Sequence, residues 1–131
     1  MRDVRSLEEK LEFKKKLEER TSDFAVAVFN CIDSLPSMAS SRVIAFQLGK
    51  SASSVGANYR EANRSESLDD FVHKIGICLK ECSETLYWID LLNRLYPGDK
   101  SFADLSGECD ELLRIFQTIK RKMHDQRKAT T

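Results

Sequence analysis

A long row of apolar residues at alternating steps of three and four most constrains the fold of this chain. The row comprises Leu68, Phe71, Ile75, Cys78, Cys82, Thr85, Ile89 and Leu92. This spacing places all its members on one face of an α-helix, which turns once in 3.6 residues. Ser67 and Asp70 are suited to cap the start, and Pro97 stops the helix, so we predict a helix over 68–95.

Three further segments repeat the helical period. A row from Phe102 to Met123, behind a Ser101/Asp104 cap, predicts a helix over 102–127. Leu17, Phe24 and Cys31 form one apolar row of a helix predicted over 6–34. Residues 1–16 are expected to be a helical extension that frays. Pro36 ends that helix, and Ser37 is expected to cap a second one over 38–63.

The helix predicted over 38–63 differs from the others because its seam is half polar and many of its residues are small. Its small residues are Ala45, Gly49, Ala52, Ser53, Gly56 and Ala57. Small side chains lower intrinsic helix stability, by about 1 kcal/mol for each Gly relative to Ala. They also let a neighbouring backbone approach closely, so we expect tight packing at this helix.

Short connections between the four predicted helices require neighbouring helices to run antiparallel. The predicted fold is therefore all-α, an antiparallel up-down-up-down four-helix bundle, and the 131 residues are expected to form one domain over 1–131. No apolar run is long enough to cross a membrane, and no signal peptide is evident. We expect a cytoplasmic protein whose four cysteines are reduced and serve as small hydrophobic residues.

Charge is unevenly distributed along the predicted bundle, although the formal net charge is zero. One end is expected to be basic, and its candidate nucleic-acid-binding residues are Arg60, Arg64, Lys120, Arg121, Lys122, Arg127 and Lys128. The opposite end is expected to be acidic, with Asp90, Asp99, Asp104, Glu108, Asp110 and Glu111. The basic end has two interpretations: a solvated surface that complements a helix dipole, or an electrostatic footprint for phosphate groups.

Candidate metal and catalytic residues are few. Cys78 and Cys82 lie one helical turn apart, with His73 preceding them, but both thiols occupy the apolar row. No Cys-x-x-Cys pair or His-Glu-x-x-His motif accompanies them. We therefore expect no metal site, no cofactor and no enzymatic activity.

Apolar residues also lie outside the main row of the helix predicted over 68–95. They are Tyr87, Trp88, Leu91 and Leu95. These side chains can cover a flanking helix of the same bundle, or they can form an interface between subunits, where Trp and Tyr are favoured. We favour the subunit interface.

Three consecutive motifs resemble a known family. They are residues 54–62 (SVGANYREA), residues 70–74 (DFVHK) and residues 79–88 (LKECSETLYW). In this order the motifs resemble the four-helix bundle proteins related to the 23S rRNA intervening-sequence proteins. The motifs are far more specific than a generic heptad pattern.

The resemblance implies a bundle that assembles into a homo-oligomeric ring, a pentamer in known relatives. Distant relatives are the accessory variability proteins of diversity-generating retroelements, which bind a reverse transcriptase and nucleic acid, and no enzymatic activity is attached to the family. The expected function is therefore a noncatalytic adaptor for RNA, DNA or a reverse transcriptase. The alternative is a protein-interaction or structural module that binds no nucleic acid.

The polar residues of the motifs are the remaining candidates for function. They are Asn58, Glu61, Lys80, Glu81 and Glu84. Asn58 and Glu61 can satisfy free backbone groups or pair with cations near the turn, and Lys80 and Glu84 have the spacing of a helical ion pair. A structural role and a binding role both remain open for this set.

Overall fold

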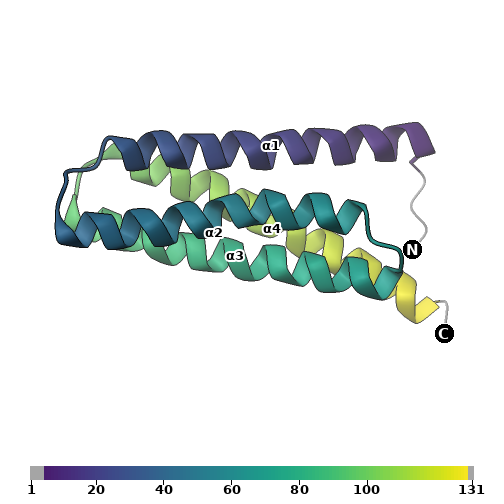
Figure 1. The fold of residues 1–131 in the computed structure, drawn as a ribbon. Coiled ribbons are helices and arrows are strands. Elements are labelled where there is room, and N and C mark those ends of the chain that lie inside the picture. Colours follow the sequence, from purple (N-terminus) through teal and green to yellow (C-terminus); the bar gives the residue numbers. More distant parts are fainter. Residues whose placement is uncertain (1–4, 130–131) are drawn as a thin grey trace.

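The computed structural model describes residues 5–129 as four helices joined by short turns (Figure 1). The helices are α1 (Leu7–Asp33), α2 (Ala39–Asn63), α3 (Leu68–Leu95) and α4 (Lys100–Ala129). Consecutive helices run antiparallel, which confirms the predicted up-down-up-down bundle, and every boundary lies within two residues of the predicted one. That residues 1–131 form a single domain stays a prediction, and residues 1–4 and 130–131 lie outside the described residues.

Two helix starts agree with the sequence analysis. The Ser6 hydroxyl accepts from the Glu9 backbone N–H at 3.1 Å, and the Glu9 carboxylate accepts from Ser6 in return. This capping box begins α1 at Leu7, so residues 7–16 are helical, while their fraying stays a prediction. At α3, Ser67 accepts from the Asp70 backbone N–H at 3.0 Å, as predicted.

Two predicted caps are wrong. The helix α2 begins after Met38 rather than Ser37, and no side chain caps it. At the start of α4, the Asp99 carboxylate accepts from the Ser101 backbone N–H at 2.9 Å and from the Ser101 hydroxyl at 2.6 Å. Asp99 supplies the capping oxygen because an ionised carboxylate is a stronger acceptor than a hydroxyl.

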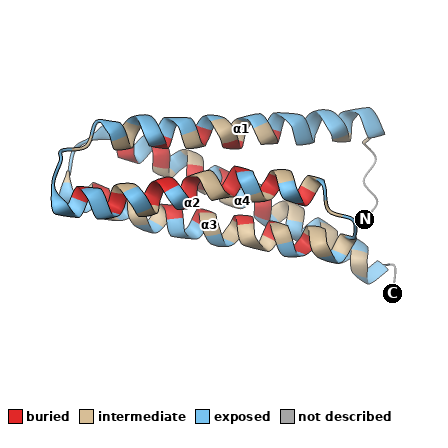
Figure 2. Cartoon of the chain, in the orientation of Figure 1, coloured by how far each residue is buried: buried red, intermediate tan, exposed pale blue. Residues whose placement is uncertain are grey.

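The core lies along the inward sides of the helices, where Figure 2 shows the buried residues. Within the predicted row of α3, residues from Ile75 to Leu92 are buried, and only Leu68 and Phe71 at its start are partly exposed. The interfaces of α3 with α2 and α4 are the most extensive, and that of α1 with α4 is the smallest. The row of α3 therefore organises the bundle.

One polar pair lies inside the core between α2 and α3. The Thr85 Oγ1 is 2.9 Å from the Ser51 Oγ and donates to the Glu81 carbonyl at 2.7 Å. Both residues are buried. Because these hydroxyls bond to each other and to backbone carbonyls, their burial leaves no polar group unsatisfied.

Glycines let α1 lie close to α2, as the small residues predicted. A Cβ added at Gly56 would lie 2.9 Å from the Thr21 Oγ1 and 3.2 Å from its Cβ. A Cβ at Gly49 would lie 3.0 Å from the Phe29 ring. Close approach at these two positions sets the distance between the two helices.

The cysteines of the core behave as small hydrophobic residues. Cys78, Cys82 and Cys109 are buried free thiols. The Cys78 thiol donates to the Val55 carbonyl at 3.6 Å, and the Cys109 thiol donates to the Cys82 carbonyl at 3.4 Å. Burial is the main cause that raises the pKa of Cys78 to about 12, so this thiol stays protonated at neutral pH.

Substituting Gly56 by Ala should destabilise the fold. The added methyl group meets the β-branched Thr21, so we expect the free energy of unfolding to fall by about 1–3 kcal/mol. Gly107→Ala is the matched control, because no atom lies within 4 Å of an added Cβ there. That variant should gain up to about 1 kcal/mol from helix propensity. Equal stability of the two variants in denaturant titrations would contradict the close approach of α1 and α2.

Alkaline pH should destabilise the protein through Cys78. Its folded-state pKa of about 12 lies above its ordinary value of 9.0, so the unfolded chain loses this proton first. The stabilisation is complete below pH 9 and is lost as pH rises toward 12, by at most about 1.4 kcal/mol per pH unit. Between pH 9 and pH 12, the free energy of unfolding of Cys78→Ala should fall less steeply with pH than that of the wild type, as measured by denaturant titrations at each pH. An equal dependence on pH in the two proteins would contradict the assignment.

Candidate functional site

The predicted basic end is partly neutralised by acidic residues. Arg60 Nη1 lies 3.3 Å from a Glu18 carboxylate oxygen, and the Arg60 guanidinium also donates to the Ser22 hydroxyl at 3.3 Å. Arg127 pairs with Asp69 at 2.9 Å. These two cations bind other helices of the same chain, which reduces their availability for phosphate groups.

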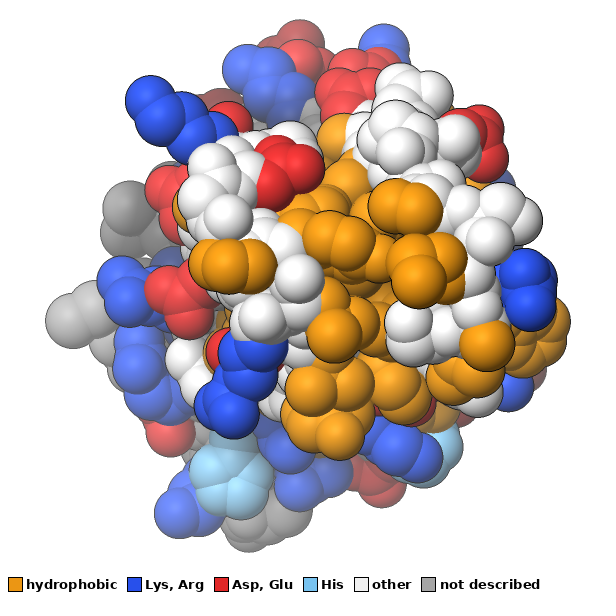
Figure 3. Space-filling model, turned by 90° about the vertical axis from the view of Figure 1, so that its left-hand side faces the viewer, with side chains coloured by type: hydrophobic (Ala, Val, Ile, Leu, Met, Phe, Trp, Pro, Cys, Tyr) orange, Lys and Arg blue, Asp and Glu red, His pale blue; other side chains and the backbone are white. Residues whose placement is uncertain are grey.

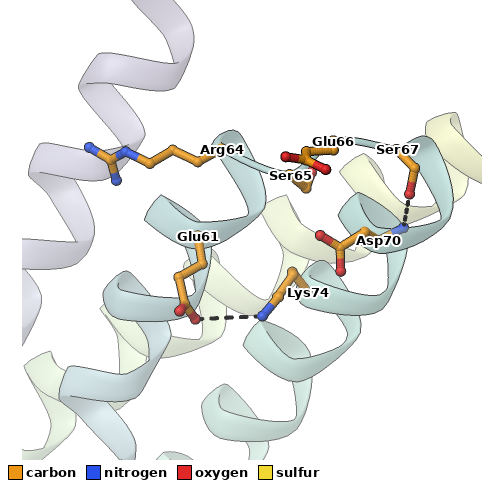
Figure 4. Close-up of a pocket in the computed structure, with 7 residues that line it drawn as sticks. All are labelled: Glu61, Arg64, Ser65, Glu66, Ser67, Asp70 and Lys74. Atoms are coloured by element: carbon orange, nitrogen blue, oxygen red, sulfur yellow. Dashed lines mark hydrogen bonds and ion pairs between the residues drawn. The ribbon is translucent and has the colours of Figure 1, made fainter.

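Arg64 lines an open hollow of about 690 Å³ at the turn between α2 and α3 (Figure 4). The other lining residues are Glu61, Ser65, Glu66, Ser67, Asp70 and Lys74. Figure 4 shows the Arg64 guanidinium pointing away from the others, while Lys74 Nζ lies 3.7 Å from Glu61. Three carboxylates and two cations line the hollow, so its charge does not favour an anion.

Exposed cations remain on the last turns of α4. Lys120, Arg121 and Lys122 are exposed, and none of them forms an ion pair among residues 5–129. Lys128 is exposed as well. Five of the seven predicted nucleic-acid-binding residues lie on α4, whereas Arg60 and Arg64 lie at the end of α2.

Two polar residues of the family motifs, both near the end of α2, make contacts within the chain. Asn58 donates from Nδ2 to the Ser54 carbonyl at 2.8 Å within α2. Glu61 pairs with Lys74 of α3, which is one of the pairings predicted for it. These contacts support a structural role for Asn58 and Glu61.

The motif residues of α3 lie nearer the surface. Glu81 is partly buried facing α2, and burial, followed by the charge of Glu84, raises its pKa, while Lys80 and Lys50 oppose the rise. Lys80 and Glu84 are exposed and, in the described part of the chain, form no ion pair with each other. These three residues therefore leave a binding role open.

The sequence analysis missed the polar contacts of α1. Glu18 accepts from Asn63 Nδ2 at 2.9 Å in addition to its pairing with Arg60. Arg20 binds Glu108 through two parallel hydrogen bonds of 2.7 and 2.8 Å, and it binds Glu111 at 3.0 Å. The guanidinium of Arg20 lowers the pKa of Glu108. Helical periodicity carries no signal for such pairs, because each partner lies on a different helix.

The predicted interface residues of α3 divide into two kinds. Trp88 and Leu91 are partly buried and pack against the core, whereas Tyr87 is 55% and Leu95 is 49% exposed. The Tyr87 and Trp88 rings meet edge to face with centroids 5.0 Å apart. Trp88 and Leu91 thus cover the bundle, whereas Tyr87 and Leu95 face outward, and the subunit interface predicted for these residues stays a prediction.

Further exposed apolar residues on α1 and α2 escaped the sequence analysis. Phe46 is 69% and Val43 is 59% exposed. Phe46 lines an open hollow of about 290 Å³ together with Phe29, Ala45 and Gly49. The pairs Val26/Phe29 and Val43/Phe46, each at spacing i, i+3 outside the apolar rows, were the available signal. Leu7, Leu11 and Phe13 near the start of α1 are exposed as well, and we name the other exposed large apolar residues the apolar belt. It consists of Val26, Phe29, Met38, Val43, Phe46, Tyr87 and Leu95.

The end of the bundle opposite the chain termini is less acidic than predicted. Figure 3 views this end and shows hydrophobic side chains gathered at its centre, with acidic and basic side chains toward the edge. Glu108 and Glu111, predicted as part of an acidic surface, instead bind Arg20. Because apolar side chains occupy the centre of this end, the acidic residues do not form one continuous acidic surface.

The described residues contain no group of three or more His, Cys, Asp or Glu side chains that could hold a metal ion. Among the helices of residues 5–129, none has the length and apolar character needed to cross a membrane. Two surfaces stand out in the described part of the chain: the apolar belt and the exposed cations of α4.

Comparison with known proteins agrees with the fold and the motifs. A crystal structure of a protein of unknown function from the S23 ribosomal protein family of Bacteroides thetaiotaomicron is similar, with 32% sequence identity and a TM-score of 0.73. The match covers 79% of this chain and 96% of that one. No curated protein matches. The family model described as 23S rRNA-intervening sequence protein matches residues 13–118, and the chain therefore belongs to the 23S rRNA-intervening sequence protein family.

Proposed function

We propose that the chain is a noncatalytic protein-interaction module that forms a homo-oligomer through the apolar belt. The observation that carries the proposal is the exposure of large apolar side chains, with Val26, Val43, Phe46 and Tyr87 all more than half exposed. Large exposed apolar surfaces on soluble domains usually mark interfaces. Aromatic side chains such as Phe46 and Tyr87 are favoured anchors there.

The position of the belt supports a cyclic assembly. A closed ring needs two different surfaces on each subunit, which meet head to tail. The belt offers two: the hollow between α1 and α2 beside Phe29 and Phe46, and the outward side of α3 with Tyr87 and Leu95. We propose that these surfaces face each other in neighbouring copies, and the resemblance of the motifs suggests a pentameric ring.

Light scattering on purified protein tests this assembly. We expect a mass several times 15.0 kDa for the wild type and a mass near 15.0 kDa for Phe46→Ser. Leu11→Ser is the matched control, because Leu11 is also more than half exposed but lies outside the belt. Circular dichroism checks that all three remain helical. A monomeric wild type, or an oligomer that Leu11→Ser and Phe46→Ser weaken equally, would contradict the proposal.

The second candidate is an adaptor for nucleic acid or for a reverse transcriptase that carries it. The observation that favours it is the exposed triplet Lys120, Arg121 and Lys122, which has no acidic partner among the described residues. A ring would repeat this triplet in every subunit, and repetition raises the apparent affinity of weak contacts. The zero net charge and the pairing of Arg60 and Arg127 favour the first candidate over this one.

Binding of a mixed RNA and single-stranded DNA pool distinguishes the two candidates. Under the adaptor candidate, binding weakens steeply with salt and is lost on charge reversal of Lys120, Arg121 and Lys122 to Glu, because phosphate contacts release counterions. Reversal of the exposed Arg42, Arg94 and Lys100 makes the same charge change elsewhere and should leave binding largely intact. Absence of binding at low salt would rule out the direct nucleic-acid form of this candidate.

A further inference from the structure

We propose that α1 is a separable helix, which is held on the bundle by a small apolar interface and by ion pairs at one level, and which opens as a unit while α2, α3 and α4 stay packed. The ion pairs form what we name the α1 clamp. It consists of Glu18, Arg20, Arg60, Glu108 and Glu111. This inference concerns the conformation of the bundle and does not depend on the apolar belt.

The first support is the small apolar contribution of α1. Only Leu17, Thr21, Phe24 and Val28 are buried in this helix, and Thr21 is polar, with its hydroxyl bonded to the Glu18 carbonyl. All four lie between residues 17 and 28, so the first ten residues of the helix, from Leu7 to Lys16, bury none. By contrast, buried residues of α3 extend from Val72 to Leu92. The free energy that holds α1 through apolar burial is correspondingly smaller than that for α3.

The second support is the shape of the surface on which α1 rests. It packs against Gly49 and Gly56 of α2, where no side chain projects between side chains of α1. Its interface with α4 is the smallest between neighbouring helices, and it has no interface with α3. The two interfaces of α1 are both smaller than those of α3, so α1 can leave without breaking the packing of α3 against α2 and α4.

The clamp compensates for this weak packing on both sides of α1. Toward α4, Arg20 makes its two-bond contact with Glu108 and a third bond to Glu111. Toward α2, Glu18 binds Arg60 and Asn63. The Arg20 and Glu108 side chains are each about one third exposed, so solvent ions reach them and screen their attraction.

The connection to α2 permits such an opening. The chain turns at residues 34–38, and α2 then starts at Ala39 without a side-chain cap. The hydrogen bonds described for this turn are short-range: Leu35 N–H donates to the Ile32 carbonyl, and the Ser34 hydroxyl donates to the Cys31 carbonyl. Leu35 itself packs against the edge of the core. Rotation about this turn would uncover Leu17, Phe24 and Val28 together with the glycine face of α2.

Hydrogen–deuterium exchange of the full chain tests the proposal. In the wild type, amides of residues 17–32 should exchange faster than those of the buried parts of α2 and α3, and high salt should widen the difference. Arg20→Gln removes all three bonds to α4 at once and should speed exchange of α1 by about tenfold, with α2 and α3 unchanged.

Arg114→Gln is the matched control, because it removes an Arg–carboxylate pair of 2.9 Å that lies entirely within α4. It should leave the exchange of α1 as in the wild type. The proposal would be overturned if the amides of α1, α2 and α3 were all protected to the same degree and neither salt nor Arg20→Gln changed the exchange of α1. If Arg20→Gln fails to fold, the salt series on the wild type decides the question alone.

Discussion

The buried row of α3 carries the packing of both α2 and α4, and the remaining structure depends on this shared contact. The members of this row from Ile75 to Leu92 are all buried, and the two interfaces of α3 are the most extensive in the bundle. Apolar burial of this extent is the main stabilising contribution available to a domain of this size. The helix α1 lies outside that row. It is attached by three buried apolar residues, by close contacts with the glycines of α2 and by ion pairs.

The apolar periodicity of the sequence predicted the four helices but not all of their caps. The spacing of apolar residues gave four helices with correct boundaries, because burial of one face determines where a helix must continue. It gave the wrong caps for α2 and α4, because Ser37, Ser101 and Asp99 are all competent capping types and only the path of the turn selects among them. Local sequence is insufficient there, since the cap depends on geometry across the connection.

The surfaces were predictable to a smaller degree, for a related reason. Lys120, Arg121 and Lys122 are exposed as expected, but Arg60 and Arg127 are bound by Glu18 and Asp69, which lie on other helices. A charge count along the chain cannot reveal such pairs. The off-row position of four apolar residues predicted an apolar face on α3. Val43 and Phe46 lie off the row of α2 in the same way and are more exposed than Tyr87 and Leu95.

The buried hydroxyl pair of Ser51 and Thr85 has a consequence for how precisely the bundle is specified. Apolar side chains tolerate sliding of one helix along another, because dispersion and burial depend weakly on direction. A displacement of α2 by one turn would separate the two hydroxyls, which now lie 2.9 Å apart within the core. This polar contact thus favours one alignment of α2 and α3 over the neighbouring alignments, as buried polar residues do in coiled coils. Replacing both residues by apolar ones would add apolar burial, but it would remove the contact that specifies the alignment.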